Sequence, residues 1–418
     1  MKINYLKLAS AFDMLSYWAI ILIPFSMAIA PAPMNVFMGM AVFGFLASSL
    51  LKKERLKLDA GVILPVLLFF IVGCLSVKNS IDLKDSLRGG VLRTAQYILI
   101  LLVMLRQVRD RRHVRFICYS ACAGLILASL DSIWQVVSGF SFIRHDYAPV
   151  VNIGLTRATA SFKDSNTLGI YLSALAPIII GMSLYYAKGK KKLILLALSI
   201  IAIAAIALTY SRPTLLALYV VLFFFGIVRR DRIMIGLLVI LAVASPFIAP
   251  RSVRDWAKQV EYDPLRFMCN DDRIAVYLNS LNMIKAHPFI GVGNGAFMKS
   301  YKKYKDFPEY RNVVTLDEMK AHNNFLHMAG EVGLIGLGIF IWFLYAVFAA
   351  SARIYRTQKD LFLKIFSLSL IASLIAFLVN GLTESSLYYS RVALIFWYIA
   401  GLSLALEKIN GGKNPKKN

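Results

Sequence analysis

Residues 188–208 read KGKKKLILLALSIIAIAAIAL, a short basic cluster followed by an uncharged apolar run. A helix that crosses the roughly 30 Å hydrocarbon core of a bilayer needs about 17–25 mostly apolar residues. Basic residues just outside one end of such a run are typical of a transmembrane helix. This stretch therefore predicts a membrane span. Comparable apolar runs recur along all 418 residues of the chain.

The composition agrees with a membrane protein throughout. Charged residues make up 17% of the chain and hydrophobic residues 58%, whereas soluble domains carry about 25% charged residues. The sequence predicts an all-α, polytopic membrane protein with about 12 transmembrane helices, in which residues 1–418 form a single membrane domain. The predicted spans are Phe12–Ala30, Met34–Leu51, Gly61–Val77, Val91–Leu105, Phe116–Val137, Leu168–Ala187, Leu193–Leu208, Thr214–Val228, Ile233–Ala249, His322–Ala350, Ile365–Val379 and Val392–Leu406.

The placement of positive charge predicts the topology. If the N-terminus is cytoplasmic, 26 of the 47 Lys and Arg residues fall in cytoplasmic segments, which is the positive-inside pattern. Both termini are then cytoplasmic, and residues 250–321 form a large, partly helical periplasmic loop between spans nine and ten. Long loops translocate regardless of charge. The other 21 basic residues, most of them in that loop, therefore indicate an anionic ligand rather than a topology signal, and the net charge of +24 does not indicate nucleic acid.

Two outer arginines are candidates for binding a diphosphate. Arg212 lies in the tight turn YSRPT (residues 210–214), and Arg273 lies in the first turn of a helix expected within the long loop. Guanidinium groups bind phosphate oxygens in a bidentate manner and stay charged at all relevant pH values. Two alternatives stay open: Arg212 as an interfacial anchor, and Arg273 in a salt bridge to Asp271 or Asp272.

His322 is the candidate general base, because it opens the tenth predicted span from the outer side. A neutral imidazole can accept a proton near pH 7, although a structural role is the open alternative. His327 and Glu331 are four residues apart and should share a helix face. The sequence has no Asp-x-Asp pair, and the spacing of His322 and His327 is poor for a helical zinc site. We therefore expect no metal and no cofactor.

Several short patterns occur in order at matching places in the predicted topology. They are YSRPTLL at 210–216, DRIAVY at 272–277, HPFIGVG at 287–293, and HNN at 322–324 followed by glycines. A fifth pattern runs from Arg157 to Asn166, with Ser161 where a glycine is usual. Together, and over most of the chain, they resemble the O-antigen ligase and polymerase family of bacterial envelope glycosyltransferases.

This resemblance implies a fold, a reaction and a set of residue roles. The fold would be GT-C-like, and the enzyme a metal-independent glycosyltransferase acting at the periplasmic face of the bacterial inner membrane. The donor would be a glycan on undecaprenyl diphosphate, and the acceptor of a ligase would be lipid A–core, which completes lipopolysaccharide. Arg212 and Arg273 match arginines that hold the donor diphosphate, and His322 matches the histidine that activates the acceptor hydroxyl.

Three further residues are expected to bind substrate or support the site. Glu384 and Arg391 resemble an acidic–arginine pair of the ligases, with glutamate in place of aspartate, and Arg157 belongs to the fifth pattern. Two related activities stay open, an O-antigen polymerase and a protein O-oligosaccharyltransferase. A 12-helix transporter is the alternative of another class, but such transporters show two related halves, which this sequence lacks.

Overall fold

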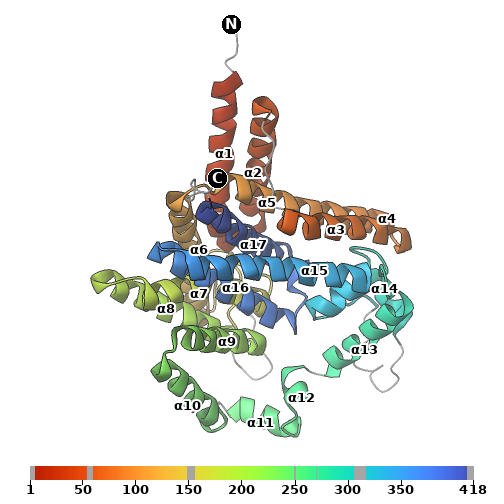
Figure 1. The fold of residues 1–418 in the computed structure, drawn as a ribbon. Helices are drawn as coiled ribbons and strands as arrows, with labels where there is room; N and C mark the ends of the chain where they lie inside the picture. Colours follow the sequence, from red (N-terminus) through yellow and green to blue (C-terminus); the bar gives the residue numbers. More distant parts are fainter. Residues whose placement is uncertain are drawn as a thin grey trace.

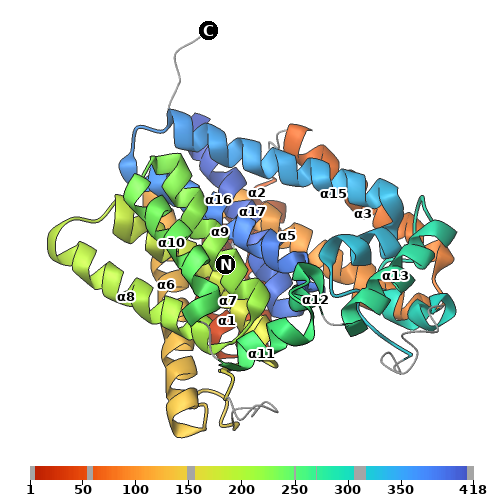
Figure 2. The same ribbon diagram turned by 90° about the horizontal axis from the view of Figure 1, so that it is seen from below.

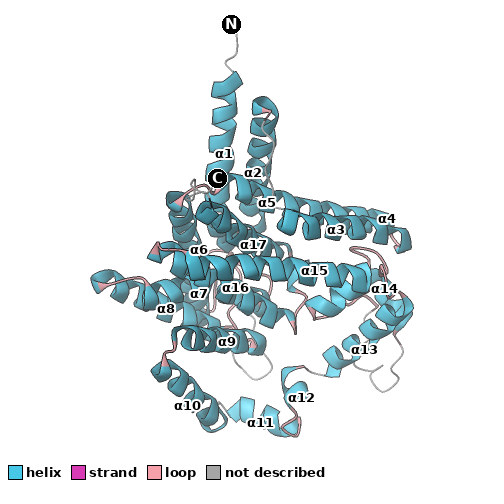
Figure 3. Cartoon of the chain, viewed as in Figure 1, coloured by secondary structure: helices cyan, strands magenta, loops and turns pink. Residues whose placement is uncertain are grey.

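The computed structural model describes residues 5–53, 60–147, 156–248, 251–269, 271–305 and 317–411. In these ranges the chain is helical, apart from turns, loops and one isolated β-bridge between Phe140 and Tyr147 (Figure 3). Eleven of the described helices are long and apolar enough to cross a membrane. These findings confirm the predicted all-α polytopic membrane protein.

The helices follow one another along the whole chain (Figure 1). They are α1 (Tyr5–Ile29), α2 (Pro31–Lys52), α3 (Ala60–Ser76), η1 (Val77–Asn79), α4 (Leu83–Asp85), η2 (Ser86–Leu92), α5 (Arg93–Gln107), α6 (Arg111–Ser138), α7 (Ser165–Tyr185), α8 (Gly189–Leu208), α9 (Arg212–Arg229), α10 (Arg232–Ile248), α11 (Arg251–Gln259), α12 (Pro264–Met268), α13 (Asp271–Ala286), α14 (Phe297–Ser300), η3 (Tyr301–Tyr304), α15 (Asn324–Thr357), α16 (Leu361–Gly381), η5 (Ser386–Tyr388) and α17 (Ser390–Gly411).

Each of the twelve predicted spans overlaps one of these helices. The ninth corresponds to α10, which has 17 residues, whereas the eleven candidate spans are continuous helical stretches of 18 to 34 residues. The fourth begins earlier than predicted, because the span runs from Leu83 to Gln107 and includes the π-helical segment η2. Hydropathy identifies only the part of a helix that lies in the hydrocarbon core. The more polar first turns of this span, from Leu83 onward, were therefore not predicted.

Three helices form the centre of the molecule. In α7, α16 and α17 the apolar stretches are 94%, 78% and 83% buried, compared with 22% in α8. Figure 2 shows α7, α16 and α17 with other helices on both sides. The start of α7, the end of α16 and the start of α17 meet at one end of this core, where Asn166 of α7 is hydrogen-bonded to Glu384 between α16 and α17. That end is where the candidate site residues gather.

Helix α15 is broken at Gly333, and the segment before α14 forms hydrogen bonds with the backbone groups at the break. Gly333 has φ 70° and ψ −178°, a backbone conformation that is essentially limited to glycine. The amides of Val292 and Gly293 donate to the carbonyls of Gly330 and Glu331, at 2.8 and 3.0 Å, and the amide of Leu334 donates to the carbonyl of Pro288 at 2.8 Å. The glycine-rich segment 287–295 therefore has a structural role, because it hydrogen-bonds to the backbone of a membrane helix at its break.

The remaining part of the long segment leaves the helical body and returns to it. Figure 1 shows α10, α11 and α12 as an arm that follows α9 and leads to α13, which packs against α15. The helix predicted over Arg273–Ala286 is observed as α13. The arm and α13 bring Arg273 from a position far along the chain to the end of the central helices.

Candidate functional site

Glu384 connects four parts of the chain. It lies between α16 and α17, and its side chain is 4% exposed. The amide of Asn166 donates to Oε1 at 2.8 Å, and Arg273 forms an ion pair with the same oxygen. Nδ1 of His322 lies 3.4 Å from Oε2. Both carboxylate oxygens are thus held by the starts of α7, α13 and α15.

The partners of Glu384 keep it ionised. Burial alone would raise the pKa of this carboxyl, but the hydrogen bond from His322 and the charge of Arg273 outweigh burial and hold its pKa below the usual value. At neutral pH the group is therefore a carboxylate. It can accept a hydrogen bond from Nδ1 of His322 and form an ion pair with Arg273 at the same time.

Three arginines converge around this carboxylate. Arg157 donates from Nε to the carbonyl of Thr209 at 2.9 Å and from Nη2 to Asn166 at 3.2 Å. Burial lowers its pKa, and the charge of Arg273 acts in the same direction. Arg157 and Arg273 also lie close enough to Arg212 to act on it electrostatically. The sequence placed these arginines on separate elements, and the fold brings them together.

Arg212 is positioned by the turn before α9 and by the arm. It donates to the carbonyl of Phe267, and its guanidinium carbon lies 5.7 Å from the centroid of the Phe267 ring. Pro213 occupies the first turn of α9, where a missing N–H has no cost. Phe267 belongs to α12, so the arm contributes directly to the position of Arg212.

The HNN pattern joins the start of α15 to the segment after α16. Asn323 caps α15 by accepting from the amides of residues 325 and 326, and its own amide donates to the carbonyl of Leu382 at 2.9 Å. Asn324 donates to the Ser386 hydroxyl at 2.7 Å. Each asparagine uses both ends of its side chain amide, so neither serine nor aspartate could replace it without losing a bond.

His322 itself sits in a strained backbone conformation. Its φ is +48°, which is uncommon for a residue other than glycine. The hydroxyl of Tyr277, one turn after Arg273 on α13, donates to the His322 carbonyl at 3.1 Å. Ala160 and Tyr210, in two other segments of the site, also have positive φ. Such conformations cost of order 1–3 kcal/mol each and gather where function fixes the backbone.

His327 has a structural position. Its side chain is 2% exposed, and its ring lies between those of Phe297 and Tyr388 at centroid distances of 4.3 and 3.5 Å. Nδ1 lies 3.1 Å from the Ser385 hydroxyl and Nε2 lies 3.3 Å from Glu331, with which it shares a helix face as expected. Both ring nitrogens are in use, so no ligand can reach them.

Arg391 lies near the same end of the core but has other partners than Glu384. It donates to the carbonyl of Met27 at 3.2 Å and to the carbonyl of Ser161 at 2.6 Å, and it covers the ring of Phe162 at 4.3 Å. The two residues expected from the ligase resemblance as an acidic–arginine pair are therefore engaged separately. Arg391 fixes the segment that carries Arg157, and Glu384 pairs with Arg273.

Sequence reasoning named most of these residues but missed some of their connections. Asn166 and Tyr277 were parts of recognised patterns, yet neither was assigned a role, and both bind residues of the site directly. The alternative partners of Arg273, Asp271 and Asp272, have side chains outside the described part of the structure. Arg273 is paired with Glu384.

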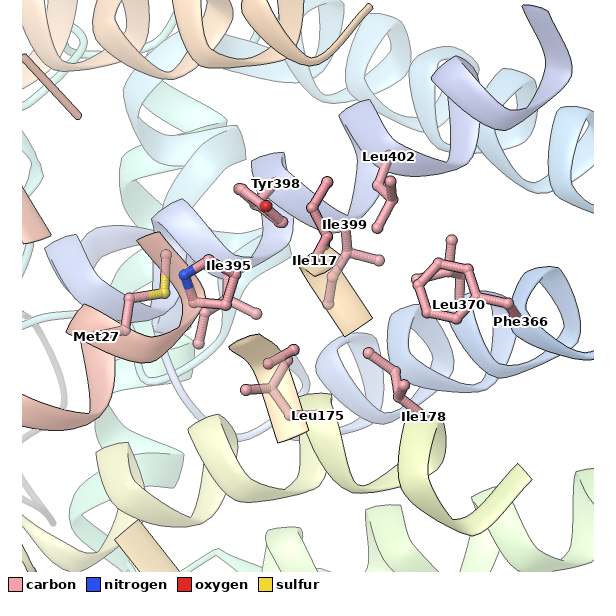
Figure 4. A pocket seen from close by; sticks show the side chains of 12 residues that line it. Met27, Ile117, Leu175, Ile178, Phe366, Leu370, Ile395, Tyr398, Ile399 and Leu402 are labelled. Atoms are coloured by element: carbon pink, nitrogen blue, oxygen red, sulfur yellow. The ribbon is translucent and has the colours of Figure 1, made fainter. Parts of the chain in front are cut away.

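A cavity in the helical core is separate from this site. It has a volume of about 20 Å³ and is lined by apolar side chains such as Leu175, Phe366 and Ile399, with the hydroxyl of Tyr398 nearby (Figure 4). That hydroxyl donates to the carbonyl of Ile20 at 2.9 Å. The cavity is too small for a sugar and is a packing defect among the membrane helices.

The chain is similar to known proteins of the bacterial envelope. A family model described as O-antigen ligase matches residues 194–341, a range that includes Arg212, Arg273 and His322. This part of the chain is therefore similar to the O-antigen ligase family. An O-antigen polymerase of Salmonella muenchen is 22% identical over 343 residues, which cover 75% of this chain and 82% of the relative. A solved chain of a peptidoglycan synthase complex that coordinates polymerization and crosslinking is similar at 16% identity and a TM-score of 0.45, over 87% of this chain and all of that one.

The similarity to proteins of O-antigen biosynthesis fits the multi-pass membrane architecture of the chain. Arg157, Glu384 and Arg391 lie outside the matched range, so their link to the site rests on the geometry described above. Among the described residues no cluster of three or more His, Cys, Asp and Glu side chains is suited to a metal ion. Metal independence stays a prediction.

Proposed function

We propose that the protein is an O-antigen ligase. It transfers a glycan from undecaprenyl diphosphate to lipid A–core at the periplasmic face of the inner membrane, with both termini in the cytoplasm. The observation that carries this proposal is the arrangement of His322, Glu384 and Arg273, in which one buried carboxylate holds both a candidate base and a candidate phosphate ligand.

The arginines would bind the donor diphosphate. Arg157, Arg212 and Arg273 converge around a site with one central carboxylate, so their combined charge favours an anion with more than one negative charge. The diphosphate gains charge as it leaves, and fixed guanidinium groups stabilise that charge in the transition state. The donor supplies the driving force, because the bond between its sugar and the diphosphate is broken.

His322 would activate the acceptor. Nδ1 donates to Glu384, which leaves Nε2 as the basic nitrogen; within the described part of the chain Nε2 has no hydrogen-bond partner. The acceptor hydroxyl gives its proton to Nε2 while its oxygen attacks the anomeric carbon of the donor sugar. The bond from that carbon to the phosphate oxygen breaks, and undecaprenyl diphosphate departs. Glu384 stabilises the imidazolium that forms.

An O-antigen polymerase is the second candidate, because a curated relative with that activity aligns with most of the chain. Purified protein should be given one lipid-linked donor and two acceptors in parallel, lipid A–core and a second lipid-linked repeat unit. Transfer to lipid A–core in excess EDTA supports a metal-independent ligase. Transfer to the lipid-linked unit alone supports the polymerase, and activity that needs added magnesium or manganese contradicts metal independence.

A further inference from the structure

Lys320 lies two residues before His322 and turns toward the protein. Its Nζ is 3.4 Å from the carbonyl oxygen of Tyr388 and 3.5 Å from the centroid of the Tyr389 ring. Among the described residues no carboxylate lies within ion-pair distance of this ammonium group. Two residues of chain span at most about 7 Å between Cα atoms, so Lys320 stays next to the candidate base.

The surroundings of Lys320 are cationic. Burial lowers its pKa to about 8, and the positive charges of Lys163 and Arg93 contribute in the same direction. The negative charges of Asp164 and Glu384 raise the pKa of Lys320, but by less than burial and the two cations lower it. Asp164 caps α7 through Thr167, and Glu384 is held by Arg273 and His322, so both carboxylates have other partners. Lys320, Arg93 and Lys163 form what we call the second cationic cluster.

Arg93 extends this cluster to a cavity. The cavity has a volume of about 60 Å³ and lies between the start of α5, the segment around Asn294, α15 and the segment around Tyr388. Thr94 and Asn294 line it with neutral polar groups. Glu331 also lines it, but that carboxylate is engaged by His327 and by the amide of Phe297. In the described part of the chain Arg93, like Lys320, has no ion-pair partner.

The second cationic cluster is distinct from the arginines around Glu384. Arg157 and Arg212 contact the turn before α9 and α12, whereas Lys320 and Arg93 contact the Tyr388 segment and its cavity. Each group has one member close to His322: Lys320 lies two residues before it in the chain, and Arg273 shares the Glu384 carboxylate with it. If the first group holds the donor diphosphate, the second remains available for the acceptor.

We propose that Lys320, Arg93 and Lys163 bind an anionic group of the acceptor lipid, a phosphate or a carboxylate, and so position the hydroxyl that His322 deprotonates. The proposal rests on the glycosyltransferase function proposed above. An anion would supply the missing negative charge around Lys320, with charge-assisted hydrogen bonds from the ammonium group. The neutral donors of Thr94 and Asn294 would complete its coordination.

The wild-type protein provides the first test, through steady-state kinetics between pH 6.5 and 9.5. Lys320 loses its proton as the pH rises through about 8, so the KM for the acceptor should rise there while the KM for the donor does not. The charged groups that face Lys320 are Lys163, Arg93, Asp164 and Glu384. Burial raises the pKa values of Tyr388 and Tyr389, so these phenols stay protonated. A flat acceptor KM would overturn the proposal.

Substitutions provide the second test, at pH 7. Lys320→Met should raise the acceptor KM about tenfold or more, as expected for the loss of a charged hydrogen bond, and should remove the rise above pH 8. Lys320→Arg should restore most of the affinity and shift the rise to higher pH. Lys302→Met is the matched control, because Lys302 is 68% exposed and paired with Asp317. If Lys320→Met cannot be purified, Arg93→Met and the wild-type pH profile decide.

Acceptors that lack one kind of anionic group identify the group that is bound. Enzymatic removal of acceptor phosphates should raise the KM of the wild type and leave that of Lys320→Met unchanged if a phosphate is bound. If dephosphorylation changes neither, a carboxyl-reduced acceptor should show the same pattern. Two results would overturn this proposal but not the proposed function. One is a rise in the donor KM of Lys320→Met, and the other is that Lys320→Met raises the KM equally for intact and fully neutral acceptors. Wild-type protein that transfers glycan to no acceptor would overturn the proposed function, and this proposal with it.

Discussion

At the scale of single residues, Glu384 connects the members of the candidate site. Its two oxygens bind different partners, His322 on one side and Arg273 on the other. The same carboxylate can therefore orient both the proposed base and the arginine proposed to bind phosphate. Removing one member of such a group changes the others, so the effects of single substitutions should not be additive.

His322→Ala should abolish transfer while the protein stays folded and inserted. A general base contributes about 10²–10⁴-fold to a rate, and the donor should still bind because the diphosphate is assigned to Arg212 and Arg273. Undecaprenyl-linked glycan should accumulate in cells and lipid A–core should stay bare, as seen on lipopolysaccharide gels. Glu384→Gln should lower kcat less, and adding it to His322→Ala should have little further effect.

Two results would remove the support for His322 as a base. One is a normal lipopolysaccharide ladder in the His322→Ala strain at matched expression. The other is loss of donor binding in a correctly inserted mutant, which would place His322 in the diphosphate site. His327 provides the comparison, because its buried, stacked ring predicts that a substitution there lowers stability before it changes the chemistry.

Arg212→Lys and Arg273→Lys should each impair transfer strongly. An ammonium group cannot reproduce the bidentate contact of a guanidinium with phosphate oxygens, and Arg273→Lys also weakens the ion pair with Glu384. Donor KM and kcat should be measured with purified protein, and ladders compared in cells. Near-normal ladders in both mutants would mean that these arginines are interfacial anchors.

At the scale of elements, the break in α15 fixes where the long loop meets the membrane helices. The segment 287–295 satisfies the backbone groups that the break at Gly333 leaves open, so the cost of unpaired groups in an apolar environment is avoided. The same segment leads to Asn294, which contacts Gly90 closely. Helix α15 begins at the HNN pattern, so its position also determines that of His322.

Gly333→Ala should destabilise the protein by about 2 kcal/mol or more, because alanine disfavours this backbone conformation and its Cβ would lie 2.0 Å from the carbonyl oxygen of Phe289. Thermal unfolding in detergent measures the effect, and transfer activity should fall with it. Gly338→Ala is the matched control on the same helix, since nothing lies within 4 Å of its added Cβ. It should be neutral or slightly stabilising. Equal unfolding temperatures for the two variants would contradict the role of Gly333.

At the scale of the whole molecule, the site lies where the three most buried helices end on one side. Glu384 follows α16, Asn166 begins α7, and Arg391 begins α17. These helices are enclosed by others and so form a rigid base, while the arm of α10 to α12 supplies the carbonyl that Arg212 contacts. A site at the end of the bundle suits the two lipid-linked substrates proposed above.

The predicted topology has both termini in the cytoplasm and residues 250–321 in the periplasm. An alkaline phosphatase fusion at Lys305 should be active, and one at Asn418, which lies outside the described residues, should be inactive, because 26 basic residues favour the inner side. A green fluorescent protein fusion at Asn418 is the positive control for the inner side. Phosphatase activity at Asn418, or none at Lys305, would contradict the topology.

The fold class and the approximate spans could be predicted from the sequence alone, and so could the candidates for the main site residues. Apolar length and flanking charge are properties of consecutive residues, so they can be read without the fold. Arg212, Arg273 and His322 stood out because each lies in a short pattern at the outer end of a predicted helix. Their alternatives stayed open, because a local pattern does not show what a side chain will contact.

Which of these residues come into contact depends on the tertiary structure. Arg273 and Glu384 are 111 residues apart and His322 and Glu384 are 62 apart, and their contacts depend on how α7, α13, α15 and the end of α16 pack together. The insertion of 287–295 into α15 likewise follows from hydrogen bonds between distant segments. Lys320 shows the same limit: its lowered pKa arises from burial and from charges brought close by the fold, and no local pattern in the sequence contains that information.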